Sequence, residues 1–303
     1  MQFRRNIKRY VRGDDVKYIK DLLVKLNYLY KSTHGTFGND SYRAVIEYQK
    51  RNKDIYGRQL DVDGIVGKLT WGAIVRDAGE VIPVTPPEEN APSFAIPSNI
   101  SSSAAALIAK DLMTVSDKRR SIVLDALRFA YDKNKPQPHM TSLYIRGGNI
   151  YNRDLKPNII SIPYLTGSYK KRYGQYCDGG RLEYMVAAVK ADSNMTGADC
   201  SGGVVGLCRK AKVVSSGFDA TANSLCGNSH SEPISKNSLH PGDWVGRSGH
   251  IGLYVGGGYI VEWLGGAYGC CLTGLNELTA YNFVDGKLHK FSRWTKFRDP
   301  KYY

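Results

Sequence analysis

One glycine-rich segment dominates the C-terminal half of the sequence: Gly197-Ala198-Asp199-Cys200-Ser201-Gly202-Gly203, followed at once by the apolar residues Val204-Val205. A small, polar turn that runs into an apolar segment predicts a loop feeding a helix, with Asp199 as the N-cap and Cys200 in the first turn. The partial positive charge of a helix N-terminus favours the thiolate over the thiol. Cys200 is therefore placed like a nucleophile, and the competing interpretation is a small buried thiol.

The strands predicted downstream bring a histidine and a carboxylate together. The turn Pro241-Gly242-Asp243 leads into one strand, and His250 begins the next. After the turn Gly256-Gly257-Gly258 a further strand runs through Glu262. If the last two strands pair antiparallel across the glycine turn, His250 and Glu262 are adjacent in space. They would then form a base and its orienting group.

A second glycine-rich turn lies upstream, in Tyr173-Gly174-Gln175-Tyr176-Cys177-Asp178-Gly179-Gly180. The Tyr-x-x-Gly-Gly pattern that starts at Tyr176, the Asp-Cys-Ser-Gly turn, the Pro-Gly-Asp turn and the strand that starts at His250 occur in a fixed order. In this combination they resemble the NlpC-type papain-like cysteine peptidases, which cut wall peptides. The resemblance covers roughly residues 165–270. It implies an α+β domain with helices packed on an antiparallel sheet.

The resemblance also implies roles for single residues. Cys200 matches the nucleophile, His250 the base and Tyr176 the tyrosine near the oxyanion hole. Asp199 and Ser201 are expected to contact substrate, Asp199 through a substrate amine in addition to its capping role. Glu262 stands where the family often has a third histidine. A carboxylate would stabilise an imidazolium better than a neutral imidazole does, so Glu262 is expected to complete the triad, and a structural carboxylate is the alternative.

The first 79 residues contain an internal repeat. The pattern around Gly35-Thr36-Phe37-Gly38 returns at Gly64-Ile65-Val66-Gly67, and apolar residues recur at helical spacing between them and from Val16 to Leu29. This predicts a small three-helix module. It resembles the peptidoglycan-binding domain of the three-helix type, which implies binding to wall glycan or peptide. The periodic positions of the module's large aromatic residues favour core packing over sugar stacking, namely for Phe37, Tyr48 and Trp71.

The predicted organisation is a binding module at residues 1–79, a proline-rich linker at residues 80–103 and a peptidase domain at residues 104–303. Residues 104–131 have a helical pattern that is interrupted near residues 114–117. The segment 139–173 gives no clear assignment beyond a covering loop or lobe.

Composition narrows the class of partner. The chain has 303 residues, 42% of them hydrophobic, and a formal net charge of +14. A basic surface suits anionic wall polymers as well as it suits nucleic acid, and no feature indicates a nucleic-acid partner. No apolar run is long enough to span a membrane, and no export signal is visible at the N-terminus. The six cysteines form no Cys-x-x-Cys pair, which predicts mostly free thiols and neither zinc nor another cofactor.

Together these features predict an endolysin-like peptidoglycan hydrolase, of the kind found in phages and prophages. It would be made in the cytoplasm and act on the wall after release. The resemblance implies a peptidase that cuts between D-glutamate and the diamino acid of the stem peptide. Two alternatives stay open: an N-acetylmuramoyl-L-alanine amidase on the same scaffold, and a wall-binding protein with a degenerate catalytic domain.

Overall fold

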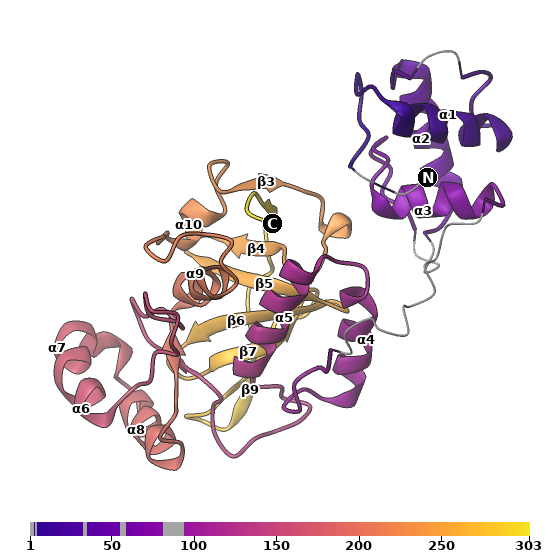
Figure 1. The fold of residues 1–303 in the computed structure, drawn as a ribbon. Helices are drawn as coiled ribbons and strands as arrows, with labels where there is room; N and C mark the ends of the chain where they lie inside the picture. Colours follow the sequence, from indigo (N-terminus) through magenta and orange to yellow (C-terminus); the bar gives the residue numbers. More distant parts are fainter. Residues whose placement is uncertain (1–2, 4, 33–34, 55–58, 81–93) are drawn as a thin grey trace. The chain divides into compact units, whose positions relative to one another are not determined.

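The computed structural model describes the chain except for residues 1–2, 4, 33–34, 55–58 and 81–93. It divides into two compact units, Met1–Phe94 and Ala95–Tyr303, so the division falls within the predicted linker (Figure 1). Most of the proline-rich part of that linker lies outside the described residues. Each unit is taken by itself below.

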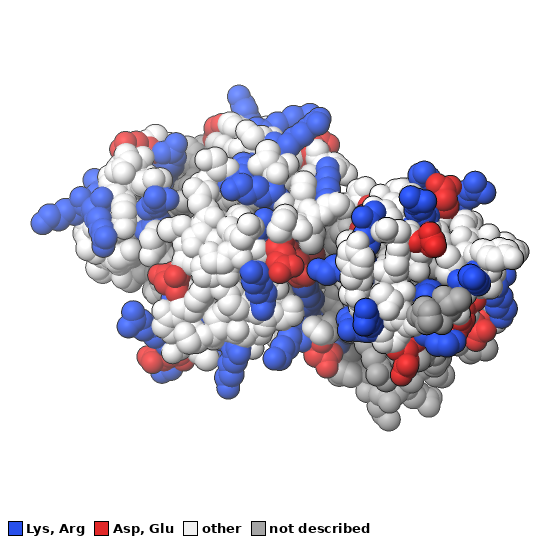
Figure 2. Space-filling view, turned by 90° about the horizontal axis from the view of Figure 1, so that it is seen from above, with Lys and Arg blue, Asp and Glu red and all other residues white. Residues whose placement is uncertain are grey.

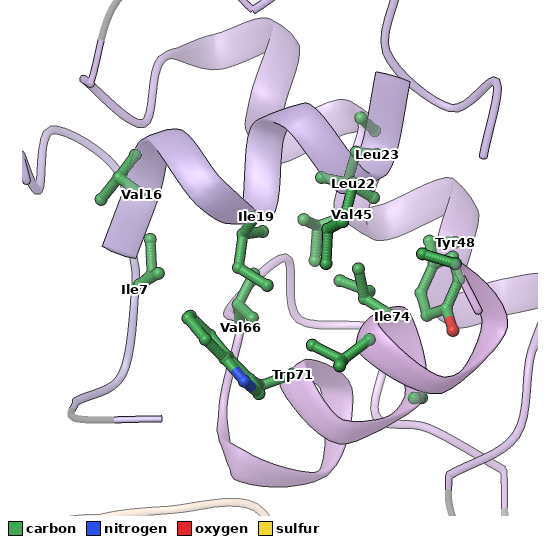
Figure 3. Close-up of a cluster of buried hydrophobic side chains, with 14 of the residues drawn as sticks. Ile7, Val16, Ile19, Leu22, Leu23, Val45, Tyr48, Val66, Trp71 and Ile74 are labelled. Atoms are coloured by element: carbon green, nitrogen blue, oxygen red, sulfur yellow. The ribbon is translucent and has the colours of Figure 1, made fainter. Parts of the chain in front are cut away.

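The first unit is built from the three helices α1 (Asp14–Lys25), α2 (Asn39–Arg51) and α3 (Lys68–Asp77). Figure 3 shows how their apolar faces meet in one core, with Ile19 and Val45 at its centre. The three aromatic residues expected in the core are buried there: Phe37, Tyr48 and Trp71, which are 0%, 1% and 4% exposed. The prediction of core packing for these side chains is confirmed.

Helix α1 is shorter than the apolar periodicity predicts, because it ends at Lys25 rather than near Leu29. Asn27 has a φ of 61°, and backbone N–H groups just beyond the helix turn back to donate to Leu23 and Val24. A left-handed residue of this kind closes a helix C-terminus. Leu29 still packs against the core from outside the helix.

The second unit has an α+β fold around a six-stranded antiparallel sheet in the order β3-β10-β4-β5-β6-β7. Its strands are β3 (Ser231–Pro233), β4 (Trp244–Arg247), β5 (His250–Gly256), β6 (Tyr259–Gly265), β7 (Gly269–Gly274) and β10 (Lys296–Pro300). Helices α4 (Ser102–Leu112), α5 (Asp117–Phe129) and α9 (Cys200–Lys210) pack against this sheet (Figure 1). The predicted fold class, helices on an antiparallel sheet after a small all-α domain, is confirmed.

The glycine turn between β5 and β6 forms as predicted. The φ angles of the three turn residues are 96° at Gly256, 61° at Gly257 and 80° at Gly258. Residues that have a Cβ atom rarely adopt φ angles in this region. Across this turn the strands pair antiparallel, with Tyr254 opposite Ile260. The hairpin therefore sets which residues of β5 and β6 face each other.

The segment that the sequence left unassigned, residues 139–173, is mostly irregular up to residue 161 and helical from Ile162 onward. It starts with β1 (Leu143–Tyr144), which pairs in parallel with β2 (Gly197–Ala198) immediately before Cys200. Between these strands lie five helical elements, which we call the lobe (residues 162–191): α6 (Ile162–Tyr164), the π-helix η1 (Leu165–Tyr169), α7 (Lys170–Tyr173), the 3-10 turn η2 (Gly174–Tyr176) and α8 (Arg181–Ala191). The lobe packs its own apolar residues against Leu143 and Ile145.

The remaining elements are peripheral: α10 (Ala222–Leu225), the 3-10 turn η3 (Lys236–Ser238) and the hairpin of β8 (Thr279–Asn282) with β9 (Lys287–Lys290). Figure 2 shows Lys and Arg side chains spread over the face in view, in keeping with the net charge of +14. Among the described residues, none of the helices has both the length and the apolar character needed to cross a membrane.

Candidate active site

Helix α9 begins at Cys200, and Asp199 is its N-cap. The Asp199 carboxylate accepts hydrogen bonds from the Gly202 N–H at 2.8 Å, the Ser201 hydroxyl at 3.0 Å and the Gly147 N–H at 2.8 Å. Cys200 is buried, and its thiol donates to the carbonyl oxygen of Gly249 at 3.9 Å. The predicted cap and the predicted place of Cys200 in the first turn are confirmed.

The glycines after Cys200 let the helix start lie unusually close to its neighbours. A Cβ on Gly202 would lie 1.9 Å from the carbonyl oxygen of Gly148, and one on Gly203 would lie 2.1 Å from the Trp263 ring. No side chain fits into either position. The small residues of the Asp-Cys-Ser-Gly-Gly segment therefore fix the thiol against both β6 and the chain that follows β1.

His250 and Glu262 face each other across the β5–β6 hairpin. The distance from His250 Nε2 to Glu262 Oε2 is 2.7 Å, and the Glu262 side chain is fully buried. The other carboxylate oxygen, Oε1, accepts a hydrogen bond from the Thr273 hydroxyl of β7 at 2.5 Å. Thr273 was not anticipated from the sequence, because nothing in a strand pattern specifies which neighbour a buried carboxylate will meet.

The surroundings of the His250 ring also involve one of its faces and its second nitrogen, Nδ1. The Trp294 ring stacks on it with centroids 5.6 Å apart and an interplanar angle of 14°. Burial lowers the pKa of His250, but hydrogen bonds with the Cys200 and Glu262 side chains outweigh this effect and raise the pKa to about 9. Since Nε2 faces the carboxylate, Nδ1 is the nitrogen left for the thiol. A ring with this pKa is an imidazolium at neutral pH.

The turn that precedes His250 is fixed by the segment around α10. Asn223 accepts a hydrogen bond from the Gly249 N–H at 2.9 Å, and the carbonyl of Gly249 is the acceptor for the thiol of Cys200. Cys226 packs against Gly246 of β4, where an added Cβ would meet its sulfur at 2.5 Å. All six cysteines, Cys208 among them, are free and buried.

Tyr144, which was not predicted from the sequence, lies close enough to the thiol for the charge of Cys200 to act on it. It belongs to β1, whose partner strand β2 leads directly into Asp199 and Cys200. Burial, then the charges of Cys200 and Asp199, raise the pKa of Tyr144 to about 12. A signal was present in the sequence, because Tyr144 opens a Tyr-x-x-Gly-Gly pattern, Tyr144-Ile145-Arg146-Gly147-Gly148, identical in form to the one at Tyr176.

Tyr176 has a different environment from the one expected for it. It ends η2 in the lobe, and its ring contacts the Tyr173 ring, with centroids 6.3 Å apart, and the Arg146 guanidinium, with Cζ 5.7 Å from the ring centroid. Asp199 and Ser201 both flank the thiol, but their mutual hydrogen bond and the capping bonds occupy the Asp199 carboxylate.

This arrangement suits acyl transfer through a thiol. Cys200 is positioned as a nucleophile, His250 as a proton carrier and Glu262 as the group that orients and charges the ring. In the part of the chain that the structure describes, no cluster of three or more His, Cys, Asp or Glu side chains is arranged to hold a metal ion.

Comparisons with known proteins bear on the two units separately. Residues 12–74 match the model of a family described as a putative peptidoglycan binding domain. Among solved structures, the structure of NlpC2 from Trichomonas vaginalis matches with 21% sequence identity and a TM-score of 0.24. That match covers 39% of this chain and 49%, about half, of the NlpC2 chain. The first unit thus contains a putative peptidoglycan-binding domain, as predicted, and the second has the α+β fold with an antiparallel sheet that was predicted for it.

Proposed function

We propose that this chain is a peptidoglycan hydrolase, and that its second unit cuts wall stem peptides between D-glutamate and the diamino acid by a thiol mechanism. The observation that carries the proposal is the arrangement of Cys200 at the start of α9 beside His250, which hydrogen-bonds the buried Glu262 at 2.7 Å. The putative peptidoglycan-binding domain supports the substrate class. The resemblance in sequence to NlpC-type peptidases supports the bond.

In the first half of the proposed reaction, the Cys200 thiolate attacks the carbonyl carbon of the scissile amide. The negative charge that develops on the carbonyl oxygen is stabilised by the Cys200 N–H, which as a first-turn amide has no acceptor within its helix, and by the Tyr144 hydroxyl. Because the pKa of Tyr144 is raised to about 12, this hydroxyl keeps its proton and can donate it in a hydrogen bond.

The second half needs a proton donor and then a base. The tetrahedral intermediate collapses when His250 gives its Nδ1 proton to the leaving amine, which leaves a thioester on Cys200. A water molecule then loses a proton to the neutral His250 and attacks the thioester carbon. The C–S bond breaks, the acid is released, and thiolate and imidazolium are restored. Glu262 keeps the ring oriented through Nε2 in every step.

The basic surface is expected to act in wall attachment. With a net charge of +14, the chain should concentrate on anionic wall polymers, and this attraction should weaken as salt screens it. Synthesis in the cytoplasm and release to the wall at lysis, as in endolysins, is part of the proposal and rests on the sequence resemblance alone.

Digestion of purified walls tests the proposal. Mass spectrometry of the soluble products should show a newly exposed amino group on the diamino acid, and Cys200→Ala should release none. A new amino group on L-alanine would instead indicate the amidase. Undiminished lysis by Cys200→Ala would refute the thiol mechanism, and release of no product by the parent chain would favour a wall-binding protein without catalysis.

A further inference from the structure

The chain around β1 presents alternate residues to two different environments. Leu143 and Ile145 point into the apolar core of the lobe, where they are 0% and 1% exposed. Since side chains alternate along an extended chain, Tyr144 and Arg146 point to the opposite face. Pairing continues beyond the strand, because the Ile145 N–H donates to the Ala198 carbonyl at 2.9 Å. Arg146 is therefore directed to the same side as Tyr144, the residue beside Cys200.

Three tyrosines of the lobe lie along the chain at Arg146 and Gly147, and one of them contacts the Arg146 guanidinium. The Tyr169 hydroxyl accepts a hydrogen bond from the Arg146 N–H at 3.2 Å, and the Tyr176 ring lies 5.7 Å from the guanidinium carbon. The Tyr173 hydroxyl lies 2.9 Å from the position that a Cβ on Gly147 would take. These rings contact one another in sequence order, with centroids 5.4 Å and 6.3 Å apart. The lobe thus fixes the backbone at Arg146 through Tyr169 and contacts the guanidinium through Tyr176.

The guanidinium of Arg146 has no carboxylate partner in the described part of the chain. No ion pair within 4.0 Å involves it, and the residue is exposed. The nearby Tyr144 side chain is the largest cause that raises the pKa of Arg146. The nearby Asp199 carboxylate already accepts three hydrogen bonds. A guanidinium without a carboxylate partner can present two parallel N–H donors, the geometry that binds a carboxylate in bidentate fashion.

We propose that Arg146 binds a carboxylate of the substrate that flanks the scissile bond, and that it determines specificity for peptides that carry this charge. The inference rests on the proposed function for the nature of the bond. When glutamate is linked through its γ-carboxyl group, its α-carboxylate stays free and ionised on the residue that acylates Cys200. A diamino acid on the leaving side carries a carboxylate as well. Both groups are carboxylates, one on each side of the scissile bond, and an experiment can distinguish which of them Arg146 binds.

Binding to a chain that cannot turn over tests this assignment. Calorimetry with Cys200→Ala would use L-Ala-γ-D-Glu-diamino acid and two analogues, one with the glutamate α-carboxylate and one with the diamino acid carboxylate converted to the carboxamide. We expect one analogue to bind about tenfold more weakly or worse, because it loses a charge-assisted hydrogen bond with the guanidinium. The analogue affected identifies the side of the scissile bond.

The quantity to compare is the ratio of the Kd of the affected analogue to the Kd of the unmodified peptide. Arg146→Gln in the Cys200→Ala background should lower this ratio to below about twofold. Arg146→Lys should retain part of it, because lysine keeps the positive charge but lacks the two parallel N–H donors. Arg153→Gln removes the same charge from an exposed site outside the lobe and should leave the ratio unchanged. A ratio that persists in Arg146→Gln, or equal binding of all three peptides by Cys200→Ala, would overturn the assignment.

Hydrolysis by the chain with Cys200 intact separates the two proposals. If the peptides bind with an Arg146-dependent carboxylate preference but no amide bond is cut, the hydrolase proposal fails and the binding site stands. If the peptides are cut with no carboxylate preference, the hydrolase proposal stands and the role of Arg146 is refuted.

Discussion

Replacing Glu262 by glutamine should weaken catalysis and move its pH range. The pKa of His250 is raised from 6.5 to about 9, which corresponds to roughly 3 kcal/mol in favour of the protonated ring. Hydrogen bonds with Cys200 and with Glu262 both raise the pKa of His250, whereas burial lowers it. If about half depends on the carboxylate, Glu262→Gln loses roughly 2 kcal/mol of support for the imidazolium, or about 10–30-fold in kcat/KM.

The direction of the pH change follows from the same interaction. Activity of a thiolate–imidazolium pair falls as pH rises through the pKa of His250, so the alkaline limb of the parent should lie near pH 9. Removing the negative charge of Glu262 lowers that pKa, and the limb should move to lower pH.

The assay is kcat/KM for a stem peptide measured from about pH 5 to about pH 10, because this profile reports the groups that titrate in the free enzyme. Glu232→Gln, on an exposed position of β3, is the matched control and should leave both quantities unchanged. A thermal melt of each variant would show that the fold is retained. If Glu262→Gln kept the parent's alkaline limb and its kcat/KM within twofold, the carboxylate would have no part in charging the ring.

Three other substitutions test separate parts of the site. Thr273→Val should leave a buried carboxylate oxygen without its donor and lower the free energy of unfolding by about 1–3 kcal/mol in urea titrations, whereas Thr273→Ser should restore most of it. Tyr144→Phe should lower kcat about 100-fold if its hydroxyl stabilises the oxyanion, and Tyr176→Phe by less than tenfold; the reverse order would return that role to Tyr176. Gly202→Ala should destabilise the second unit by about 1–3 kcal/mol or more in thermal melts, since its Cβ would lie 1.9 Å from a backbone oxygen. The control Gly217→Ala has no neighbour within 4 Å and should be neutral in the same melts.

Local patterns in the sequence were sufficient to predict the parts of the site that are formed by neighbouring residues. The capping of α9 by Asp199 and the hairpin that joins His250 to Glu262 each depend on a short segment with a clear turn. The three-helix core was equally predictable, because its apolar residues recur at helical spacing. In all of these cases the contact partner lies within a few residues or across one tight turn.

The tyrosine beside the thiol could not be identified in this way. Two Tyr-x-x-Gly-Gly patterns occur upstream of Cys200, one at Tyr144 and one at Tyr176, and the resemblance was drawn on the second. In the structure the lobe is inserted between β1 and β2, and the parallel pairing of Tyr144 with Ala198 bridges that insertion. Parallel pairing across a long crossover leaves no periodic signal that links the two strands. The sequence pattern therefore does not tell which of the two tyrosines lies nearer to Cys200.

The surroundings of Glu262 decide which charge state the site holds at rest. Cys271 of β7 pairs with it and Cys270 is the next residue along that strand; burial raises the pKa of both thiols well above the ordinary value, so they stay neutral. The Thr273 hydroxyl donates one hydrogen bond but brings no charge. A buried carboxylate without a cation is strongly destabilising, and His250 is the residue that can supply one here. The hydrogen bond between His250 and Glu262 therefore favours the protonated ring before any substrate binds.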